Sequence, residues 1–407
     1  MSIRNLIHTR ALVALLALFV AGACATTNAP DFQPTAASGP AWPAPPLEAR
    51  ILYTRTLVSE ESLDNEQSFG ASLFALLTGT PPPRYHVYQP MDLAVSADGQ
   101  RLYVSDFGQL LVFMFDLENQ TVTTITPGDR PFARPFGIAL DADENLYVVE
   151  QATSQITVLD RQHNVLGSFT DPSLVRPADI ALDTARGRIY VADPARQHSD
   201  VHNVKVFDTE WNLTGVVGKG RGTCDGCLLF PTYLEVDQSG NLFVTNTLNS
   251  SVEVFDASGE HVRSVGEPGN SFGMFDKPKG VAVDSFGNTY VVDSGWSNVQ
   301  IFNDAGEVLL FFGGRGSGPG RMHNPTGIAI GPQNSIYVAD YLNNRVVAYQ
   351  LVNTSAEDSF LDPNAIDEEI SFDQQVPANA EDETSQQSTT IEQRSDPGST
   401  NSQGAER

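Results

Sequence analysis

Basic residues are scarce in this sequence. Its 407 residues include 24 Lys and Arg against 50 Asp and Glu, which gives a formal net charge of −26. Binding to nucleic acid or to anionic lipid headgroups depends on clustered Lys and Arg. The composition therefore argues against a nucleic-acid partner and against a polybasic grip on a membrane surface.

Long hydrophobic runs are also lacking. The apolar stretch of residues 11–21 is shorter than the roughly 20 residues that a membrane-spanning helix requires. It follows Arg4 and Arg10 and precedes Gly22 and Ala23, which is the arrangement of a secretory signal peptide. Residues 1–23 are therefore expected to be an export signal that is removed.

Cysteine is nearly absent, and the first of the three cysteines directly follows the signal segment. The run Gly22-Ala23-Cys24 resembles the lipobox of bacterial lipoproteins, although Ala21 stands where leucine is more common. The resemblance implies cleavage before Cys24, lipid attachment at Cys24 and sorting to the outer membrane, because Ala25 rather than Asp follows. An ordinary signal peptide with an incidental cysteine is the alternative.

The other two cysteines form a Cys224-Asp-Gly-Cys227 run. It lies among several glycines, which is unlike the helix N-terminus that carries a redox pair. Leu228 replaces the histidine that haem attachment requires, and no second cysteine pair completes a zinc site. We expect Cys224 and Cys227 to form a local disulfide in an oxidising compartment.

Two segments have too few apolar residues to form a core. Residues 24–49 are rich in Ala, Pro and Thr, which predicts a semi-rigid linker. Residues 353–407 carry 13 acidic and 2 basic residues among many Ser and Gln, which predicts a disordered tail. Docking of this tail on a basic partner is the alternative. The folded body is expected over residues 50–352.

One pattern recurs six times in this body. A proline is followed after two residues by an apolar–small–apolar triplet, a turn, an aromatic–Val–x–Asp strand and a further β-rich run. The repeats start at Pro90, Pro135, Pro177, Pro231, Pro278 and Pro325. Short strands separated by Gly, Asn and Asp turns predict four-stranded antiparallel meanders. Six such units of about 40–50 residues predict an all-β, six-bladed β-propeller.

Two of the repeats resemble NHL repeats. The matching runs are residues 277–284 with Tyr290-Val-Val-Asp293, and residues 324–330 with Tyr337-Val-Ala-Asp340 and the following Asn-rich turn. The resemblance covers residues 84–351. It implies an NHL-type propeller, a fold that often serves as an interaction domain.

The sixth repeat ends after its third strand and therefore lacks a fourth. Residues 50–58 have the pattern of a lone strand upstream of the first repeat. We expect this strand to complete the sixth blade, because an open ring would leave exposed edge strands. Between this strand and the first repeat, the spacing of Phe69, Leu73, Leu76 and Leu77 predicts a short helix that covers one face.

Three repeats have an aromatic residue just after the second strand, namely Phe107, Trp296 and Tyr341. Their blades are neighbours in a closed ring, so the three side chains are expected on one loop face. Aromatic residues in loops on a rigid scaffold are typical of a binding surface. Packing on adjacent loops is the alternative.

The polar residues that end the second strands look like an ion ring, but Asp and Asn at this place are expected to be turn residues. These residues are Asp106, Glu150, Asp193, Asn246, Asp293 and Asp340.

The innermost strands break their own pattern at three positions. The third residue, counting from the proline, is Gly in blades 2, 5 and 6 but Asp92 in blade 1 and Asp179 in blade 3. In blade 4, Glu235 stands where the other blades have Ala. Carboxylates at a crowded axis are costly unless something compensates them. A Ca²⁺ or Mg²⁺ site formed by these three residues is one hypothesis, although blades 1 and 3 are not adjacent. Separate hydrogen bonds to backbone amides are the alternative.

Together these features predict a lipid-anchored propeller that binds an envelope protein or peptide and is not an enzyme. A divalent-metal-dependent hydrolase or lactonase is the alternative, since related six-bladed propellers hold a cation at the mouth of their channel. The sequence leaves the partner and the oligomeric state open.

Overall fold

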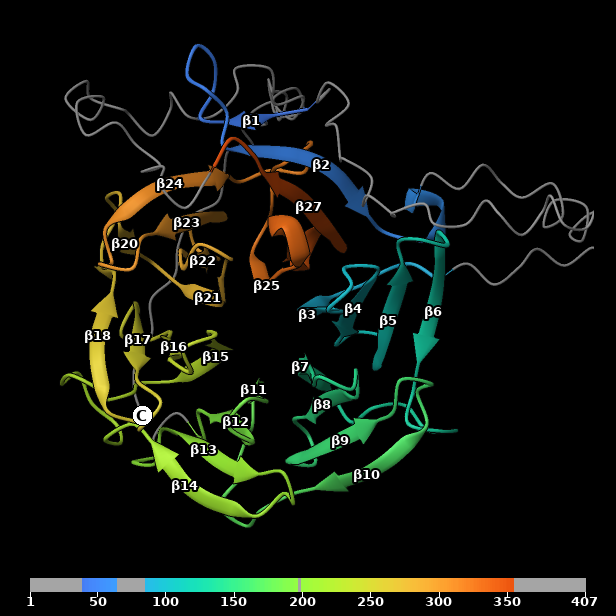
Figure 1. The fold of residues 1–407 in the computed structure, drawn as a ribbon, viewed down its shortest axis with the longest axis vertical. Helices are drawn as coiled ribbons and strands as arrows, with labels where there is room; N and C mark the ends of the chain where they lie inside the picture. The colour runs from blue at the N-terminus through green and yellow to red at the C-terminus, as the bar shows by residue number, and fades with distance from the viewer. Residues whose placement is uncertain (1–38, 64–84, 197–198, 355–407) are drawn as a thin grey trace, which may run out of the picture. The chain divides into compact units, whose positions relative to one another are not determined.

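The computed structural model describes residues 39–63, 85–196 and 199–354. Within these residues the chain forms six antiparallel sheets that lie around a common axis (Figure 1). Each sheet is one blade, and its strands follow one another from the axis to the rim. The body is therefore a six-bladed β-propeller, which confirms the fold predicted from the repeats.

The first three blades follow one another along the chain. Blade 1 consists of β3 (Pro90–Val95), β4 (Arg101–Asp106), β5 (Leu111–Asp116) and β6 (Thr121–Ile125). Blade 2 consists of β7 (Pro135–Leu140), β8 (Leu146–Glu150), β9 (Gln155–Leu159) and β10 (Val165–Phe169). Blade 3 consists of β11 (Asp179–Asp183), β12 (Arg188–Asp193), β13 (Asn203–Asp208) and β14 (Leu213–Val217).

The next two blades repeat this order. Blade 4 consists of β15 (Pro231–Val236), β16 (Leu242–Asn246), β17 (Ser251–Phe255) and β18 (His261–Val265). Blade 5 consists of β21 (Pro278–Val283), β22 (Thr289–Asp293), β23 (Asn298–Phe302) and β24 (Val308–Gly313). A short parallel pair, β19 (Glu267–Pro268) and β20 (Met274–Phe275), lies in the connection between these two blades.

The sixth blade joins the two ends of the body. Its first three strands are β25 (Pro325–Ile330), β26 (Ser335–Asp340) and β27 (Arg345–Leu351). Its fourth strand is β2 (Ile51–Leu57), which pairs antiparallel with β27. The pairing runs from Ile51 opposite Leu351 to Leu57 opposite Val346. The prediction that an N-terminal strand closes the ring is confirmed.

The folded body begins before the boundary that composition indicates. β1 (Ala41–Trp42) pairs with β2 and adds a fifth strand to the sixth blade. The indole of Trp42 is buried against the rings of Phe312 and Tyr349. Residues 41–49, which composition assigns to the linker, thus belong to the body, because a buried indole anchors a segment that is otherwise rich in proline.

The apolar core is divided into layers, one between each pair of neighbouring blades. Between blades 1 and 2, for example, Tyr103 and Val112 pack with Ile138 and Val148. Most blades are covered on both sides, so their middle strands are buried along most of their length. This explains why these strands are continuous apolar runs in the sequence rather than alternating ones.

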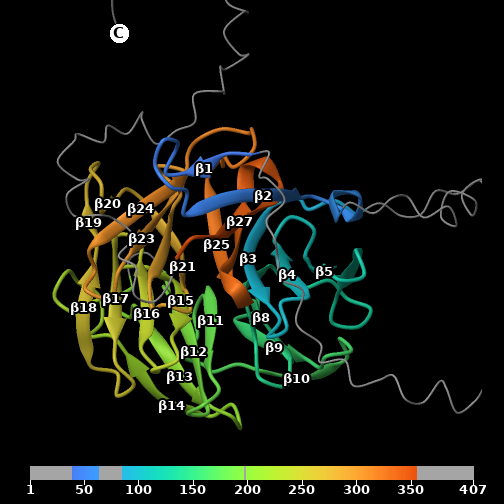
Figure 2. The same cartoon turned by 45° about the horizontal axis from the view of Figure 1, so that its top comes forward.

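The ring has two faces, and Figure 2 shows it in a tilted view. The innermost strands begin on one face, which we call the upper face. The upper face also carries the loops between second and third strands, including the 3₁₀ turn η3 (Tyr341–Asn343). The innermost strands end on the lower face, which carries the turns within each strand pair, including η2 (Pro332–Asn334).

Four predictions fall on residues outside the described part of the chain. They are the export signal of residues 1–23, lipid attachment at Cys24, the short helix around Phe69 to Leu77, and the character of the acidic tail. The 3₁₀ turn η1 (Glu60–Leu63) is the last described element before the third of these segments. Among the described residues, no helix has the length and apolar character needed to cross a membrane.

Candidate functional site

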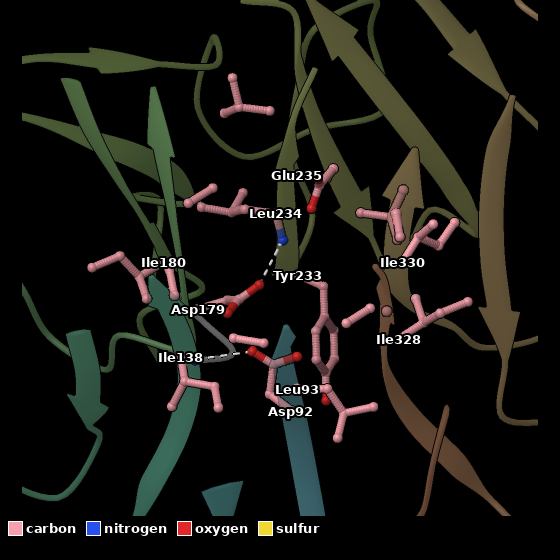
Figure 3. Close-up of a pocket in the computed structure, with 18 of the residues that line it drawn as sticks. Asp92, Leu93, Ile138, Asp179, Ile180, Tyr233, Leu234, Glu235, Ile328 and Ile330 are labelled. Atoms are coloured by element: carbon pink, nitrogen blue, oxygen red, sulfur yellow. Dashed lines mark hydrogen bonds between the residues drawn. The ribbon is translucent and has the colours of Figure 1, made fainter. Parts of the chain in front are cut away.

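The six innermost strands surround a cavity of about 220 Å³ on the propeller axis (Figure 3). In five of the blades, the register shifts between the first proline and the apolar triplet. Such a bulge bends a strand and re-aims its side chains. The bulges lie beside the third residue from the proline, which is where the sequence departs from its repeat.

Asp92 and Asp179 come together in this cavity although their blades are not neighbours. Gly137 belongs to the blade between them, and a Cβ at this position would overlap Asp179. Gly327 makes room for Asp92 in the same way on its other side. The two carboxyl groups interact directly with each other. The separation of blades 1 and 3 along the ring is therefore no obstacle, because glycine leaves the space between them open.

Each of the two carboxyl groups accepts a backbone hydrogen bond from the next blade. The N–H of Ile138 donates to Asp92 Oδ2 at 2.9 Å, and the N–H of Leu234 donates to Asp179 Oδ2 at 2.7 Å. Asp179 Oδ1 receives no hydrogen bond from the described residues. Backbone amides thus compensate one oxygen of each carboxyl group and leave a buried oxygen of Asp179 in need of a partner.

Burial changes the acidity of these side chains. Desolvation raises the pKa of Asp92 to about 7 and the pKa of Glu235 to about 8. Burial, together with the nearby charge of Asp92, also raises the pKa of Asp179 well above its ordinary value. A proton shared between Asp92 and Asp179 is the simplest way for both carboxyl groups to occupy a site with little water.

Tyr233 closes the cavity toward the upper face. Its buried ring reaches from blade 4 to blade 1, where the hydroxyl donates a hydrogen bond of 3.3 Å to the carbonyl oxygen of Met91. The ring also packs against Phe136, with 6.1 Å between the ring centroids. Tyr233, which stands where other blades have glycine, therefore blocks the upper end of the cavity. The repeat pattern alone does not indicate this role.

Glu235 lines the same cavity, two residues beyond Tyr233 on β15. Among the described residues, no group of three or more His, Cys, Asp or Glu side chains is arranged to hold a metal ion. The Ca²⁺ or Mg²⁺ site at Asp92, Asp179 and Glu235 thus stays a prediction. The structure brings two of its members together and places the third further along the cavity.

The polar residues that end the second strands hold the upper loops in place. Asp193, for example, accepts hydrogen bonds from the N–H groups of Val175, Arg176 and Ala195. Asp293 accepts hydrogen bonds from four backbone N–H groups of two loops. For Asp106, Asp193 and Asp293, these contacts include a backbone N–H group of the residue's own turn, as expected of a turn residue.

Phe107, Trp296 and Tyr341 all lie in upper-face loops and are half-buried. The guanidinium of Arg134 lies over the Phe107 ring, with Cζ 5.9 Å from the ring centroid. The N–H of Trp296 donates to Asp293, which holds its loop against the second strand. The structure thus places the three aromatic side chains on one face of adjacent blades, and their role in binding stays a prediction.

Six further large apolar side chains are exposed in loops of the upper face. Their exposed fractions range from 41% to 51%, and they are Tyr85, Tyr88, Val175, Val201, Leu248 and Leu342. Within the described turns of the lower face that connect two strands, Phe286 is exposed to 37%. Sequence reasoning missed the six residues because single apolar residues in loops have no periodic signal.

Exposed arginines accompany these apolar residues. Five of them lie in upper-face loops and form no ion pair with a described carboxylate: Arg134, Arg176, Arg196, Arg221 and Arg315. Two other upper-face cations are paired, Arg130 with Glu150 and Lys277 with Asp276. The upper face therefore combines exposed apolar side chains with arginines that can pair with the carboxylates of a partner.

The lower face is acidic. Aspartates at or beside its inner turns are Asp98, Asp141, Asp183, Asp237 and Asp284, and those of its outer turns are Asp116, Asp160, Asp208, Asp256 and Asp304. Hydrogen bonds within the turns keep many of them ionised, and the amide of Asn164 holds the pKa of Asp160 below its ordinary value. Arg101 and Arg186 each pair with one inner aspartate.

The disulfide between Cys224 and Cys227 is present, as predicted. It closes a loop between blades 3 and 4, in which Gly226 approaches the side chains of Phe255 and His261. The equivalent loop between blades 5 and 6 has a similar bridge but no cysteines. The disulfide therefore stabilises a loop shape that the fold also adopts without it.

The ring of blades, the axial cavity and the two unlike faces define a six-bladed β-propeller with several candidate sites. A family model described as a 6-bladed beta-propeller matches residues 282–366. A search of curated proteins finds no match.

Solved structures share the fold at low sequence identity. A protein of unknown function from Bacteroides thetaiotaomicron has a TM-score of 0.51 and 17% identity, over 65% of this chain and 70% of its own. A gluconolactonase candidate has a TM-score of 0.51 and 13% identity, over 65% of this chain and 89% of its own. A streptogramin B lyase has a TM-score of 0.49 and 13% identity, over 65% and 94%. At these identities the similarity shows the fold alone.

Proposed function

We propose that this propeller is a binding module whose upper face takes up a protein segment with apolar and acidic side chains. The observation that carries the proposal is the combination of exposed apolar side chains and unpaired arginines on that face. Exposed apolar groups on a folded surface mark interaction sites when they gather on one side. The lower face has the opposite character, so the two faces select different partners.

The aromatic side chains supply the anchors of this surface. Phe107, Trp296 and Tyr341 are half-buried, so their rings are already held by the loops before a partner arrives. Rigid aromatic side chains lose little conformational entropy on binding, and aromatic residues and arginine dominate interface hot spots. The guanidinium of Arg134 lies over the Phe107 ring, so an arginine and an aromatic side chain occur together at this place on the surface.

Charge complementarity defines the chemistry of the partner. The unpaired arginines of the upper loops favour carboxylates, whereas the acidic lower face repels them. In a partner segment that carries Asp or Glu between apolar residues, the carboxylates would pair with the arginines and the apolar side chains would pack on the apolar surface. It would also be steered to the upper face before contact.

The proposal includes the location of the protein. The signal-like segment and Cys24 favour an NHL-type propeller that is lipid-anchored in the bacterial envelope. The disulfide between Cys224 and Cys227 is consistent with an oxidising compartment. The partner would then be another envelope protein or peptide.

Site-specific photocrosslinking tests the proposal. A crosslinking amino acid at Trp296 or Phe107 should capture the same partner in the producing cells, and a crosslinker at Phe286 on the lower face should not. The captured partner is then purified and titrated against the full chain. Phe107→Ala/Trp296→Ala/Tyr341→Ala should weaken this complex at least about tenfold while the melting temperature stays close to that of the wild type. Equal capture from Phe286, or full affinity of the triple variant, would contradict the proposal.

The alternative, a metal-dependent hydrolase or lactonase, has no specific observation in its favour. The described residues include no arrangement of three metal-ligating side chains. The likeness to a gluconolactonase candidate concerns the fold only. We therefore propose one function.

A further inference from the structure

The axial cavity opens toward the lower face and is closed toward the upper one. Val95, Leu140 and Ile330, at the lower ends of their strands, are half-buried. Asp92 and Asp179, deeper in the cavity, are exposed to only 6% and 3%. Tyr233 blocks the upper end. A ligand would therefore enter from the acidic face, opposite to the protein-binding surface.

The cavity is large enough for a small organic molecule. Its volume is about 220 Å³. An apolar cavity of about 150 Å³ in another protein core holds benzene. The axial cavity thus has room for one ring, or a chain of similar size, with a short substituent.

The inner part of the cavity has three carboxyl groups and no basic side chain among its lining residues. The carboxyl groups are those of Asp92, Asp179 and Glu235. Asp179 Oδ1 is buried and receives no hydrogen bond from the described residues. Figure 3 shows Asp92, Asp179, Tyr233 and Glu235 around the cavity, with Asp179 closer to Asp92 than Glu235 is. A buried carboxylate oxygen needs a donor or a cation, and the described residues supply Asp179 Oδ1 with neither, whereas Oδ2 accepts the N–H of Leu234.

The apolar wall of the axial cavity and the residues near its opening complete the candidate binding site. Apolar side chains such as Leu182, Val236 and Val283 line the outer part of the cavity. Asp237, in the turn that follows β15, acts electrostatically on Glu235. Carboxylates near an opening with low-dielectric walls concentrate ions of the opposite sign there. The path therefore favours a molecule that is both cationic and apolar.

The geometry fits an organic cation better than a bare metal ion. Ca²⁺ takes about six to eight oxygen ligands at 2.3–2.6 Å. Glu235 lies two residues along its strand from the layer of Asp92 and Asp179, which is roughly 6.6 Å. The described residues contain no group of three such side chains that could hold a metal. An ammonium group can contact carboxylates that are spread in this way, because its three N–H donors point in different directions.

We propose that the axial cavity binds a small organic cation, a primary alkylammonium compound whose apolar body is about the size of one ring. The ammonium group donates hydrogen bonds to Asp179 Oδ1 and to Glu235, and the apolar body lies against the aliphatic wall. This site is independent of the protein-binding upper face, so either one can exist without the other.

Binding at this site depends on pH. The carboxyl groups of Asp92 and Glu235, whose pKa values are raised to about 7 and about 8, carry protons in mildly acidic solution. The titratable groups that face them are Asp179, Tyr233 and, toward the mouth, Asp237. Protons compete with the ammonium group for these carboxylates. The affinity therefore rises as the pH increases through this range.

Calorimetric titration of the full chain with benzylammonium tests the proposal, with benzyl alcohol as the neutral ligand of the same shape. At about pH 8, benzylammonium should bind at least about tenfold more tightly than benzyl alcohol. Its affinity should fall at least about tenfold when the pH is lowered to about 6, because the carboxyl groups take up protons. Equal affinity for the two ligands, or no pH dependence, would overturn the proposal.

Two variants locate the site. The Glu235 side chain accepts no hydrogen bond from the described residues, so Glu235→Gln should leave the fold intact. Because the variant cannot become negatively charged, benzylammonium should bind at least about tenfold more weakly. Asp129→Asn, in an exposed upper-face loop, is the matched control and should bind as the wild type does. Unchanged affinity of Glu235→Gln would refute the assignment. A rise in melting temperature with Ca²⁺ or Mg²⁺, without benzylammonium binding, would assign the carboxyl groups to a metal ion instead.

Discussion

At the scale of single residues, the packing of side chains at the propeller axis depends on which positions of the innermost strands are glycine. Asp92, Asp179 and Tyr233 occupy the centre because Gly137 and Gly327 leave it free. Six bulky residues at these positions could not coexist, and six glycines would leave the axis open. The departures from the repeat thus form one packed group, although Asp92 and Asp179 are 87 residues apart in the sequence and Asp179 and Tyr233 are 54 residues apart.

The raised pKa values of the axial pair predict how stability changes with pH. In the unfolded chain both carboxyl groups have a pKa near 4, whereas in the folded chain the pKa of Asp92 is about 7 and that of Asp179 is well above its ordinary value. The folded state therefore binds more protons between about pH 4 and pH 7. Its free energy of unfolding falls as the pH rises through this window.

Asp92→Asn/Asp179→Asn should flatten this dependence by an amount on the order of a few kcal/mol. The measurement is urea denaturation of both proteins at about pH 5 and about pH 8. The matched control, Asp129→Asn, should retain the slope of the wild type. Identical slopes in the wild type and the double variant would show that the pair does not titrate in this window.

Gly137 should tolerate no side chain. Gly137→Ala places a methyl group where it would overlap the backbone and carboxyl group of Asp179, so the inner strands must move apart. We expect a loss of roughly 1–3 kcal/mol in the free energy of unfolding, the usual cost of overpacking a core. Gly215→Ala is the control, because a Cβ at that position meets open space. Equal stability of both variants would mean that the axis adapts more easily than the packing indicates.

At the scale of secondary-structure elements, the ring closes through strands from the two ends of the body. The pairing of β2 with β27 replaces an exposed edge with backbone hydrogen bonds and buries Leu57 and Ile51. β1 then protects the outer edge of β2 and brings Trp42 into the core. The missing fourth strand of the last repeat predicts β2, but the short β1 has no pattern from which it could be predicted.

Trp42 should therefore be important for the stability of the whole ring. Trp42→Ala removes an indole that is 1% exposed and packs on Phe312 and Tyr349. Large-to-small changes of this kind cost about 3–5 kcal/mol in a core. Chemical denaturation measures the loss, and Leu47→Ala, in the same segment but 52% exposed, should be nearly neutral. A nearly neutral Trp42→Ala would show that β1 contributes little to closure.

At the scale of the whole molecule, the two proposed binding sites lie on different faces of the ring. The upper face has exposed apolar side chains and arginines that form no ion pair with a described carboxylate, and the turns of the lower face are rich in aspartate. An acidic protein segment and an organic cation would thus approach from opposite sides. The proposed protein-binding surface and the proposed cavity site can therefore be tested separately.

Lipid attachment at Cys24 is a prediction for the whole molecule, because it determines where the propeller is held. Cys24→Ala should abolish labelling with a fatty-acid probe and release the protein from the membrane fraction. Cys224→Ala/Cys227→Ala is the control and should keep the label, since these cysteines form the disulfide of the rim. Labelling that persists in Cys24→Ala would contradict the lipoprotein interpretation.

The number of blades, the order of strands within each blade, the closure of the ring and the disulfide could be predicted from the sequence. These features follow from short-range patterns, such as the repeated proline and the turn residues, and from counting strands. The sequence could not predict that Asp92 meets Asp179 across Gly137, that Tyr233 blocks the upper end of the cavity or that Trp42 is buried. These contacts join residues from different blades, and their distances depend on the closed ring and on the space left by glycine. The chemistry of each face was likewise decided by folding, because it sums isolated loop residues that have no common pattern in the sequence.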